Sequence, residues 1–113
     1  MTFLSIDCDF WNHLRRSSMR GYLNELALNC RAFGLPLHAV MNHQQMLPLV
    51  DASGADTLIN LDTHSDLADS LADMLNCGTW VSFCRQRHHG RYHWVHAGPL
   101  HEGECNPNDP IWS

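Results

Sequence analysis

Hydrophobic positions along the chain follow two spacings in turn, and this alternation predicts strands and helices one after another. Residues 3–8 (FLSIDC) are a short apolar run that ends in acids, which is typical of a buried parallel strand. The apolar positions of residues 19–30 recur at helical spacing. Ser17 or Ser18 can cap this helix, and Gly34 ends it.

The same alternation continues along the rest of the chain. It predicts a strand over residues 36–41, a helix within residues 43–53, a strand over residues 57–61 and a helix over residues 67–75. Two further strands are predicted over residues 79–84 (TWVSFC) and 91–97 (RYHWVHA). Residues 98–113 are rich in Gly, Pro and Asn, which predicts an irregular tail.

Strands that alternate with helices are typical of right-handed βαβ units, which build a mostly parallel sheet covered by helices. We therefore expect a small three-layer α/β/α fold in a single domain that spans residues 1–113, with residues 98–113 as a largely irregular tail. A sheet of about five strands in so short a chain leaves strand edges and apolar faces uncovered, so we also expect a homodimer.

Composition and charge narrow the classes of partner. The 113 residues include no lysine, and seven arginines face twelve acids, for a formal net charge of -5. This charge repels a phosphate backbone, so nucleic acid is not expected as a partner. No apolar run approaches the ~20 residues that span a bilayer, so no membrane partner is expected either. Five cysteines without a CxxC pair, and no secretory signal, predict reduced thiols and a cytoplasmic protein.

Acids and histidines gather where three predicted strands end: Asp7 and Asp9, then Asn42 and His43, then Asp62, His64 and Asp66. The carboxyl ends of parallel strands meet at one edge of a sheet, and residues i and i+2 of a strand point the same way. Four carboxylates that converge there repel one another strongly unless cations neutralise them. Oxygen-rich ligand sets with two imidazoles favour Mn²⁺, Mg²⁺ or Fe²⁺ over Zn²⁺, and six ligands suit two ions. The sequence therefore predicts a metal centre.

The two acidic motifs differ in how specific they are. A DxD pair at the end of a strand often caps the next helix or is simply solvated. An N-terminal DxD strand also opens the haloacid-dehalogenase fold, in which the first Asp is a nucleophile beside Mg²⁺, and that interpretation predicts a phosphatase. Phe10 and Trp11 fit that motif poorly, and it leaves DTHSD (residues 62–66) unexplained. Three alternating ligand types after an apolar strand have no packing rationale, so DTHSD favours metal binding.

DTHSD resembles the Asp-Ala-His-x-Asp signature of the ureohydrolases, the arginase and agmatinase superfamily, and SIDCDFW (residues 5–11) resembles their Ser-x-Asp-x-Asp strand. The motif order differs, because the DxD strand comes first here, as though the chain were circularly permuted and shortened. That combination is similar to the small peptide arginases, which convert arginine side chains to ornithine within ribosomally made precursor peptides. The resemblance covers three motifs between residues 4 and 81.

The resemblance implies a minimal arginase-like fold and a centre of two Mn²⁺ ions. It assigns the ligands by motif position: Asp7 and Asp62 bridge the ions, His43 and Asp66 complete the shell of one ion, and His64 and Asp9 complete that of the other. It also implies that Asp66 is a catalytic residue, which orients the hydroxide that attacks the substrate.

One departure from the family pattern concerns the proton shuttle. NCGTWV (residues 76–81) resembles the segment in which ureohydrolases carry a His-Gly sequence, and Cys77 stands where that histidine would be. We therefore expect the proton to be transferred by one of the histidines between residues 88 and 101, with His96 and His101 as the candidates.

The substrate side of the site is predicted from residue chemistry. Glu102 and Glu104, in HEGE, are the candidates for holding the guanidinium, because a carboxylate binds it in bidentate fashion and favours arginine over lysine. Trp80 and Trp94 are candidates for stacking on the guanidinium plane, with Cys77 nearby. The alternative for both tryptophans is a place in the core, where aromatic residues on strands more often lie.

Together these features predict a Mn²⁺-dependent peptide arginase, which hydrolyses arginine side chains of a precursor peptide to ornithine and urea. Besides the haloacid-dehalogenase-like phosphatase, two alternatives stay open. One is another metal-dependent amidohydrolase of the same superfamily, such as a deacetylase or an agmatinase-like enzyme. The other is a non-catalytic metal-binding module. Retention of all six ligands argues against that module, and loss of the shuttle histidine argues for it.

Overall fold

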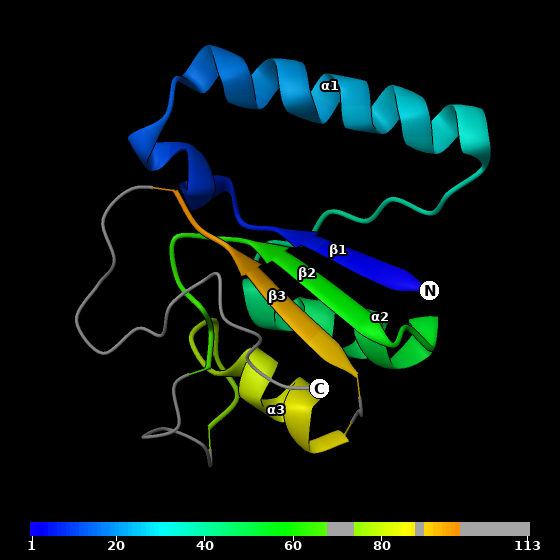
Figure 1. The fold of residues 1–113 in the computed structure, drawn as a ribbon, viewed down its shortest axis with the longest axis vertical. Coiled ribbons are helices and arrows are strands. Elements are labelled where there is room, and N and C mark those ends of the chain that lie inside the picture. Colours follow the sequence, from blue (N-terminus) through cyan, green and yellow to red (C-terminus); the bar gives the residue numbers. More distant parts are fainter. Residues whose placement is uncertain (68–73, 88–89, 98–113) are drawn as a thin grey trace.

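Three parallel strands form a small open sheet at the centre of the protein. The computed structural model describes residues 1–67, 74–87 and 90–97. In this part of the chain the strands are β1 (Thr2–Ile6), β2 (Thr57–Leu61) and β3 (Arg91–Val95), in the order β1-β2-β3 (Figure 1). Ile6 pairs with Leu61, and Leu61 pairs with Val95, so the three carboxyl ends lie level. The predicted α/β class and parallel sheet are confirmed.

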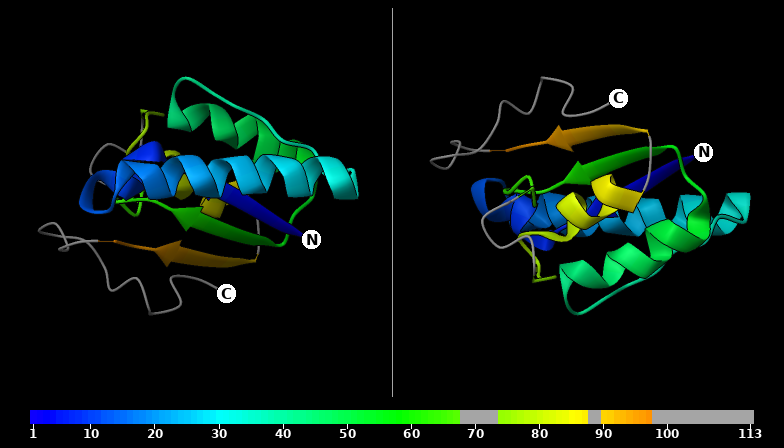
Figure 2. Two further views of the ribbon diagram at one scale, coloured as in Figure 1. Left: turned by 90° about the horizontal axis from the view of Figure 1, so that it is seen from above. Right: turned by 90° about the horizontal axis from the view of Figure 1, so that it is seen from below.

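Three α-helices accompany the sheet in the described residues. They are α1 (Arg16–Phe33), α2 (Met46–Ser53) and α3 (Trp80–Arg87), and the 3₁₀ helices η1 (Cys8–His13) and η2 (His43–Gln45) precede α1 and α2. The helices α2 and α3 lie together on one face of the sheet, and α1 runs beside the β1 edge (Figures 1 and 2). No helix among the described residues combines the length and the apolar character needed to cross a membrane.

The core lies between the sheet and the pair α2 and α3. Alternate strand residues point into it, as the burial of Leu58 and Asn60 on β2 and of Tyr92 and Trp94 on β3 shows. The buried hydrophobic cluster joins these strands to both helices, and its members are Met46, Leu47, Val50, Leu58, Trp80, Val81, Cys84, Tyr92 and Trp94. The period of two along each strand therefore fixes which residues can reach the site at the carboxyl ends.

The predicted boundaries hold for several elements. The helix expected up to Gly34 is α1, and Gly34 ends it in the left-handed conformation at φ 65°. The expected cap at Ser17 or Ser18 is wrong, because α1 begins at Arg16 and both serines lie inside its first turn, where the Ser18 N–H already donates to the carbonyl oxygen of Arg15 at 3.0 Å. The helix expected within residues 43–53 is η2 followed by α2. Pro48 lies in the first turn of α2, where its missing N–H has no carbonyl partner to lose, and Gly54 follows the last turn at φ 66°.

Two predicted strands are wrong. Residues 36–41 form no strand: this segment pairs with none of β1, β2 and β3, and Leu37 and Met41 are exposed. Residues 80–84 belong to α3 instead, and Thr79 lies in the turn before it. A helix packed deep against a sheet is apolar on several sides, so a six-residue apolar run shows no period that separates it from a buried strand.

The other expectations fall on parts of the chain outside the described residues. Most of the helix expected over residues 67–75 lies there, since residues 68–73 are not described, and so does the irregular tail expected over residues 98–113.

Candidate metal centre

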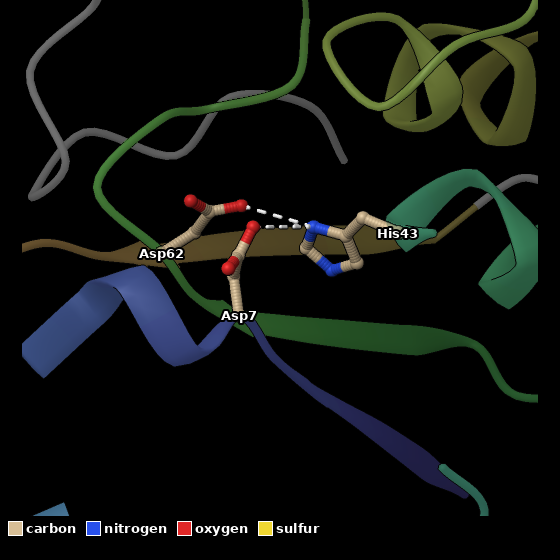
Figure 3. A group of neighbouring side chains, drawn as sticks. All are labelled: Asp7, His43 and Asp62. Atoms are coloured by element: carbon tan, nitrogen blue, oxygen red, sulfur yellow. Dashed lines mark ion pairs between the residues drawn. The ribbon is translucent and has the colours of Figure 1, made fainter. Parts of the chain in front are cut away.

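Predicted ligands from three distant segments meet at the carboxyl edge of the sheet. Asp7 directly follows β1, Asp62 directly follows β2, and His43 begins η2. Figure 3 shows the three side chains pointing toward one another, with both carboxylates directed at the His43 ring. One ligand atom from each of the three residues lies within 4.8 Å of the other two. Asp7 and Asp62 come together at strand ends as expected, whereas His43 reaches the same edge from η2 and not from the end of a strand.

A second group of potential ligands shares a residue with the first. It consists of Asp9, Asp62 and His64, whose ligand atoms also lie within 4.8 Å of one another. Nδ1 of His64 lies 3.4 Å from Oδ2 of Asp9 and 3.8 Å from Oδ1 of Asp62. Asp62 thus presents Oδ2 to the group of His43 and Oδ1 to that of His64. The two candidate ligand groups therefore share one carboxylate, with one oxygen directed at each.

His43 is held so that one ring nitrogen faces only carboxylates. Its Nε2 lies 2.7 Å from the hydroxyl oxygen of Ser5, which is fully buried. Its Nδ1 lies 3.3 Å from Oδ2 of Asp7, 3.2 Å from Oδ2 of Asp62 and 3.0 Å from Oδ2 of Asp66. None of these three oxygens, nor any other atom of the described residues, is aligned for a hydrogen bond with Nδ1. This arrangement suits a cation placed among the four groups.

The pKa values show that negative charge exceeds positive charge in the centre. Burial lowers the pKa of His43, but its three carboxylate neighbours outweigh burial and raise the pKa to about 11. Burial, together with the charges of Asp62 and Asp7, raises the pKa of Asp9 to about 6. Burial also raises the pKa of Asp62. A divalent cation would stabilise the ionised carboxylates and replace the proton of His43.

The loop after β2 is fixed by hydrogen bonds that involve its backbone. The Asp62 N–H donates to the carbonyl oxygen of Val95 at 3.2 Å, and the Trp94 indole N–H donates to the carbonyl oxygen of Asp62 at 2.8 Å. The His64 N–H donates to Oδ1 of Asp62 at 2.9 Å. These bonds hold both oxygens of the shared carboxylate in place relative to the sheet.

Thr63 ties the loop after β2 to the loop after β1. Its backbone N–H donates to Oδ1 of Asp9 at 3.3 Å, and its hydroxyl donates to the carbonyl oxygen of Asp9 at 2.9 Å. The Asp9 N–H in turn donates to Oδ1 of Asp7 at 3.0 Å, in the turn that starts η1. The DxD and DTHSD motifs are therefore one hydrogen-bonded unit.

Asp66 reaches the centre through a strained backbone. It is the non-glycine residue with positive φ, 58°, in the described part of the chain, and such a conformation costs on the order of 1 kcal/mol. The Val81 N–H donates to its carbonyl oxygen at 3.2 Å, and the Trp80 indole N–H donates to its Oδ2 at 2.7 Å. Asp66 contacts His43 and lies outside the two groups that share Asp62.

The two candidate ligand groups differ in exposure. In the group of His43, the histidine side chain is 6% exposed, that of Asp62 is fully buried and that of Asp7 is 31% exposed. In the group of His64, the histidine side chain is 49% exposed and that of Asp9 is 28% exposed. The first group is therefore the more enclosed of the two, with Asp7 on its open side, and the second opens to solvent through His64.

The residues predicted to bind substrate or to transfer a proton lie in different parts of the structure, and some lie outside the described residues. Trp80 and Trp94 are fully buried, so their rings offer no free face to a guanidinium in this structure. Cys77 is exposed in the turn before α3. His96 lies beside Trp94 with ring centroids 4.9 Å apart, and its buried Nε2 has no hydrogen-bond partner among the described residues. His101, Glu102 and Glu104 lie outside the described residues.

Several supporting residues of the centre were not predicted. Ser5 and Asn60 are both fully buried, and the Asn60 amide donates to Oδ2 of Asp62 at 3.4 Å and to the Tyr92 hydroxyl at 3.2 Å. Each stands two residues before a ligand, Ser5 before Asp7 and Asn60 before Asp62. The period of two along a strand is the signal that identifies them, because it places them on the same face as the ligand.

Comparison with known proteins gives no match: no protein-family model, no curated protein and no solved structure matches the chain.

Proposed function

We propose that the protein is a dinuclear metal-dependent hydrolase, and that it hydrolyses the guanidinium group of arginine side chains in a peptide. One observation carries the proposal: two groups of three ligands share the carboxylate of Asp62. Asp62 would let the two groups hold a pair of ions, as a shared carboxylate does in two-metal hydrolases. When bound, such ions would lower the pKa of a water molecule and polarise the substrate.

The donor set favours Mn²⁺ as the ion. Carboxylate oxygens outnumber imidazole nitrogens in both groups, and no cysteine belongs to either. Such sets suit Mn²⁺ or Mg²⁺ better than Zn²⁺, and imidazole nitrogens favour Mn²⁺ over Mg²⁺. Asp7, His43 and Asp62 would hold the enclosed ion, and Asp9, Asp62 and His64 the exposed one.

The residues around the ions have separate roles in the proposed reaction. Asp66 is anchored by Trp80 and lies next to His43, so its carboxylate is placed to accept a proton from the attacking water and to orient it. Addition of water to the guanidinium carbon and cleavage of one C–N bond release urea and leave an amine on the peptide. That amine needs a proton, and His96, with its unpartnered Nε2 next to the end of β3, is the candidate donor among the described residues.

A peptide substrate fits the openness of the site. The His64 group lies at the surface, where the His64 side chain is 49% exposed. An arginine held within a precursor peptide can reach such a site from solvent. Its remaining contacts would come from Glu102 and Glu104, the residues predicted to hold the guanidinium.

The three-layer arginase-like arrangement and the homodimer belong to the same proposal. The helices α2 and α3 supply one layer. The other face of the sheet carries apolar side chains that are partly exposed, Leu4 at 39% and Val95 at 42%. A second layer on that face, or a second copy of the chain, would cover them.

Mass spectrometry of peptides after incubation with the protein and Mn²⁺ tests the proposal. An arginine peptide should lose CH₂N₂ per arginine, with release of urea, and should stay unchanged when EDTA is present or when Asp62 is replaced by Asn. A matched acetyl-lysine peptide and a phosphate ester serve as the competing substrates. Conversion of either in place of the arginine peptide would assign the deacetylase or the phosphatase, and bound Mn²⁺ without any conversion would indicate a non-catalytic module.

A further inference from the structure

Trp80 combines complete burial with two contacts to the metal centre. It is the first residue of α3 and belongs to the hydrophobic core. Its indole N–H donates to Oδ2 of Asp66 at 2.7 Å, and its ring lies 4.7 Å from the His43 ring, between centroids, at 46°. One side chain therefore touches both partners of the closest carboxylate–imidazole pair in the centre, which is 3.0 Å between Oδ2 of Asp66 and Nδ1 of His43.

The contact with Asp66 is reinforced from the backbone. Val81, the next residue of α3, donates its N–H to the carbonyl oxygen of Asp66 at 3.2 Å. The start of α3 thus binds Asp66 at both its side chain and its main chain, at the residue whose φ is 58°. Left-handed backbone at a non-glycine residue persists where surrounding contacts determine it, and such residues concentrate at functional sites.

The start of α3 is itself rigidly placed. The Thr79 hydroxyl, which is fully buried, donates to the carbonyl oxygen of Met74 at 2.7 Å and lies 3.0 Å from the backbone N–H of Asn76, which donates to it. The Asn76 side chain accepts the N–H of Gly78 at 2.8 Å. Trp80 is therefore held from the turn before it as well as by the core around it.

We infer that Trp80 is a positioning residue of the metal centre, whose indole N–H fixes Oδ2 of Asp66 against His43 and whose ring fixes the plane of the His43 imidazole. The inference rests on the proposed function and assigns Trp80 a role that differs from stacking on substrate. Trp94 donates its indole N–H to the backbone carbonyl oxygen of Asp62 and so fixes the loop after β2, whereas the Trp80 N–H fixes a side-chain carboxylate. Trp80 donates its N–H to a buried carboxylate. Hydrogen bonds to charged groups are short and directional, so this bond fixes the rotamers of both side chains.

The variant Trp80→Phe removes the N–H and keeps an aromatic ring. Loss of a group that orients metal ligands typically lowers metal affinity or activity by about 10- to 100-fold. We expect the Kd for Mn²⁺, measured by calorimetry on the whole protein, to rise in that range, and kcat for the arginine peptide to fall more than KM rises. The matched control is Cys84→Ala, which removes a buried core atom one turn further along α3 and should leave the Kd for Mn²⁺ unchanged.

A measurement on the wild-type protein covers the case in which Trp80→Phe does not fold. In ¹⁵N NMR spectra the indole N–H of Trp80 should exchange slowly with solvent, and its resonance should shift when Mg²⁺, a diamagnetic probe, is added. The indole N–H of Trp11, which packs on Phe10 and Tyr22 instead, is the reference and should not shift.

Different results overturn the positioning role and the proposed function. If Trp80→Phe binds Mn²⁺ and turns over as the wild type does, if Cys84→Ala loses as much affinity as Trp80→Phe, or if Mg²⁺ leaves the Trp80 resonance in place, the positioning role is wrong while the hydrolase stands. If the wild-type protein binds neither Mn²⁺ nor Mg²⁺, the proposed function fails first, and the role of Trp80 falls with it.

Discussion

Replacement of Asp62 by Asn should abolish the stabilisation of the protein by Mn²⁺ and leave the fold intact. Asp62 belongs to both ligand groups and is fully buried, and the Asn side chain has nearly the same shape. Its Oδ1 atom can still accept the N–H of His64, which now donates to Oδ1 of Asp62 at 2.9 Å. Because burial raises the pKa of Asp62, the fold favours an uncharged side chain there, and the metal-free variant should be no less stable than the metal-free wild type.

The size of the effect follows from ligand linkage. An ion present at 100 times its Kd stabilises the folded state by about 2.7 kcal/mol. A chain of 113 residues has an unfolding entropy of about 0.24 kcal/mol/K near 60 °C, so one such ion raises the Tm by about 11 °C. Two ions would raise the Tm of the wild type by about 22 °C, and the shift for Asp62→Asn should be near zero.

Calorimetric melting of EDTA-treated protein across a Mn²⁺ titration measures these shifts. Asp56→Asn is the matched control, because Asp56 is an exposed carboxylate that pairs with the N-terminal amine, away from the centre, and this variant should keep the whole Mn²⁺ shift. His64→Ala removes a ligand of the exposed group alone and should keep about half of the shift. A Tm rise in Asp62→Asn equal to that of the wild type would refute the shared carboxylate.

Three further outcomes are expected. In the metal-free protein the raised pKa of His43, about 11 against 6.5, means that its proton stabilises the fold fully below pH 6.5 and that this contribution is lost as the pH rises through 11. Mn²⁺ at Nδ1 must displace that proton, so the affinity for Mn²⁺ should rise about tenfold per pH unit near neutrality. Calorimetry in two buffers of different ionisation heat measures the proton release. An affinity that is independent of pH would contradict this prediction. Ser5→Ala removes the partner of the other ring nitrogen and should weaken Mn²⁺ binding about 10- to 100-fold, whereas Ser82→Ala, a buried serine whose hydroxyl has no partner among the described residues, should bind as the wild type does. Gly90→Ala should lower the free energy of unfolding, because a Cβ there overlaps the backbone carbonyl of Asp56. Gly21→Ala, with open space around it in α1, should raise the free energy of unfolding by up to ~1 kcal/mol. Denaturant melts measure both, and equal stabilities of the two variants would contradict the overlap at Gly90.

The convergence of Asp7, His43 and Asp62 at one edge of the sheet was predictable, whereas the place of Asp66 outside the two groups was not. Asp7 and Asp62 end adjacent parallel strands, and their places at one edge of the sheet follow from the strand–helix order alone. His43 follows from the same order, although the segment before it is not a strand, because η2 still begins at the carboxyl edge. The helix α1 was predictable from its spacing and from Gly34.

The parts that escaped prediction depend on tertiary contacts. Residues 79–84 have no period that marks them as helical, and only their packing against the sheet decides that α3 forms there. Because this segment was predicted as a strand, the contacts of Trp80 were mispredicted too. A residue on a strand and one at the start of a helix face different neighbours. The positive φ of Asp66 has no local signal in DTHSD, because the bonds that maintain it come from α3.

The ligands of the enclosed position come from residues 7, 43 and 62, and they become neighbours only after β1 and β2 have paired. An ion bound there acts as a removable cross-link that joins the start of the chain to its middle. In the unfolded chain the same residues are ends of long loops, and gathering them costs loop-closure entropy. Release of the ion by a chelator would therefore loosen this edge of the sheet, and metal supply would govern both the chemistry and the lifetime of the folded chain.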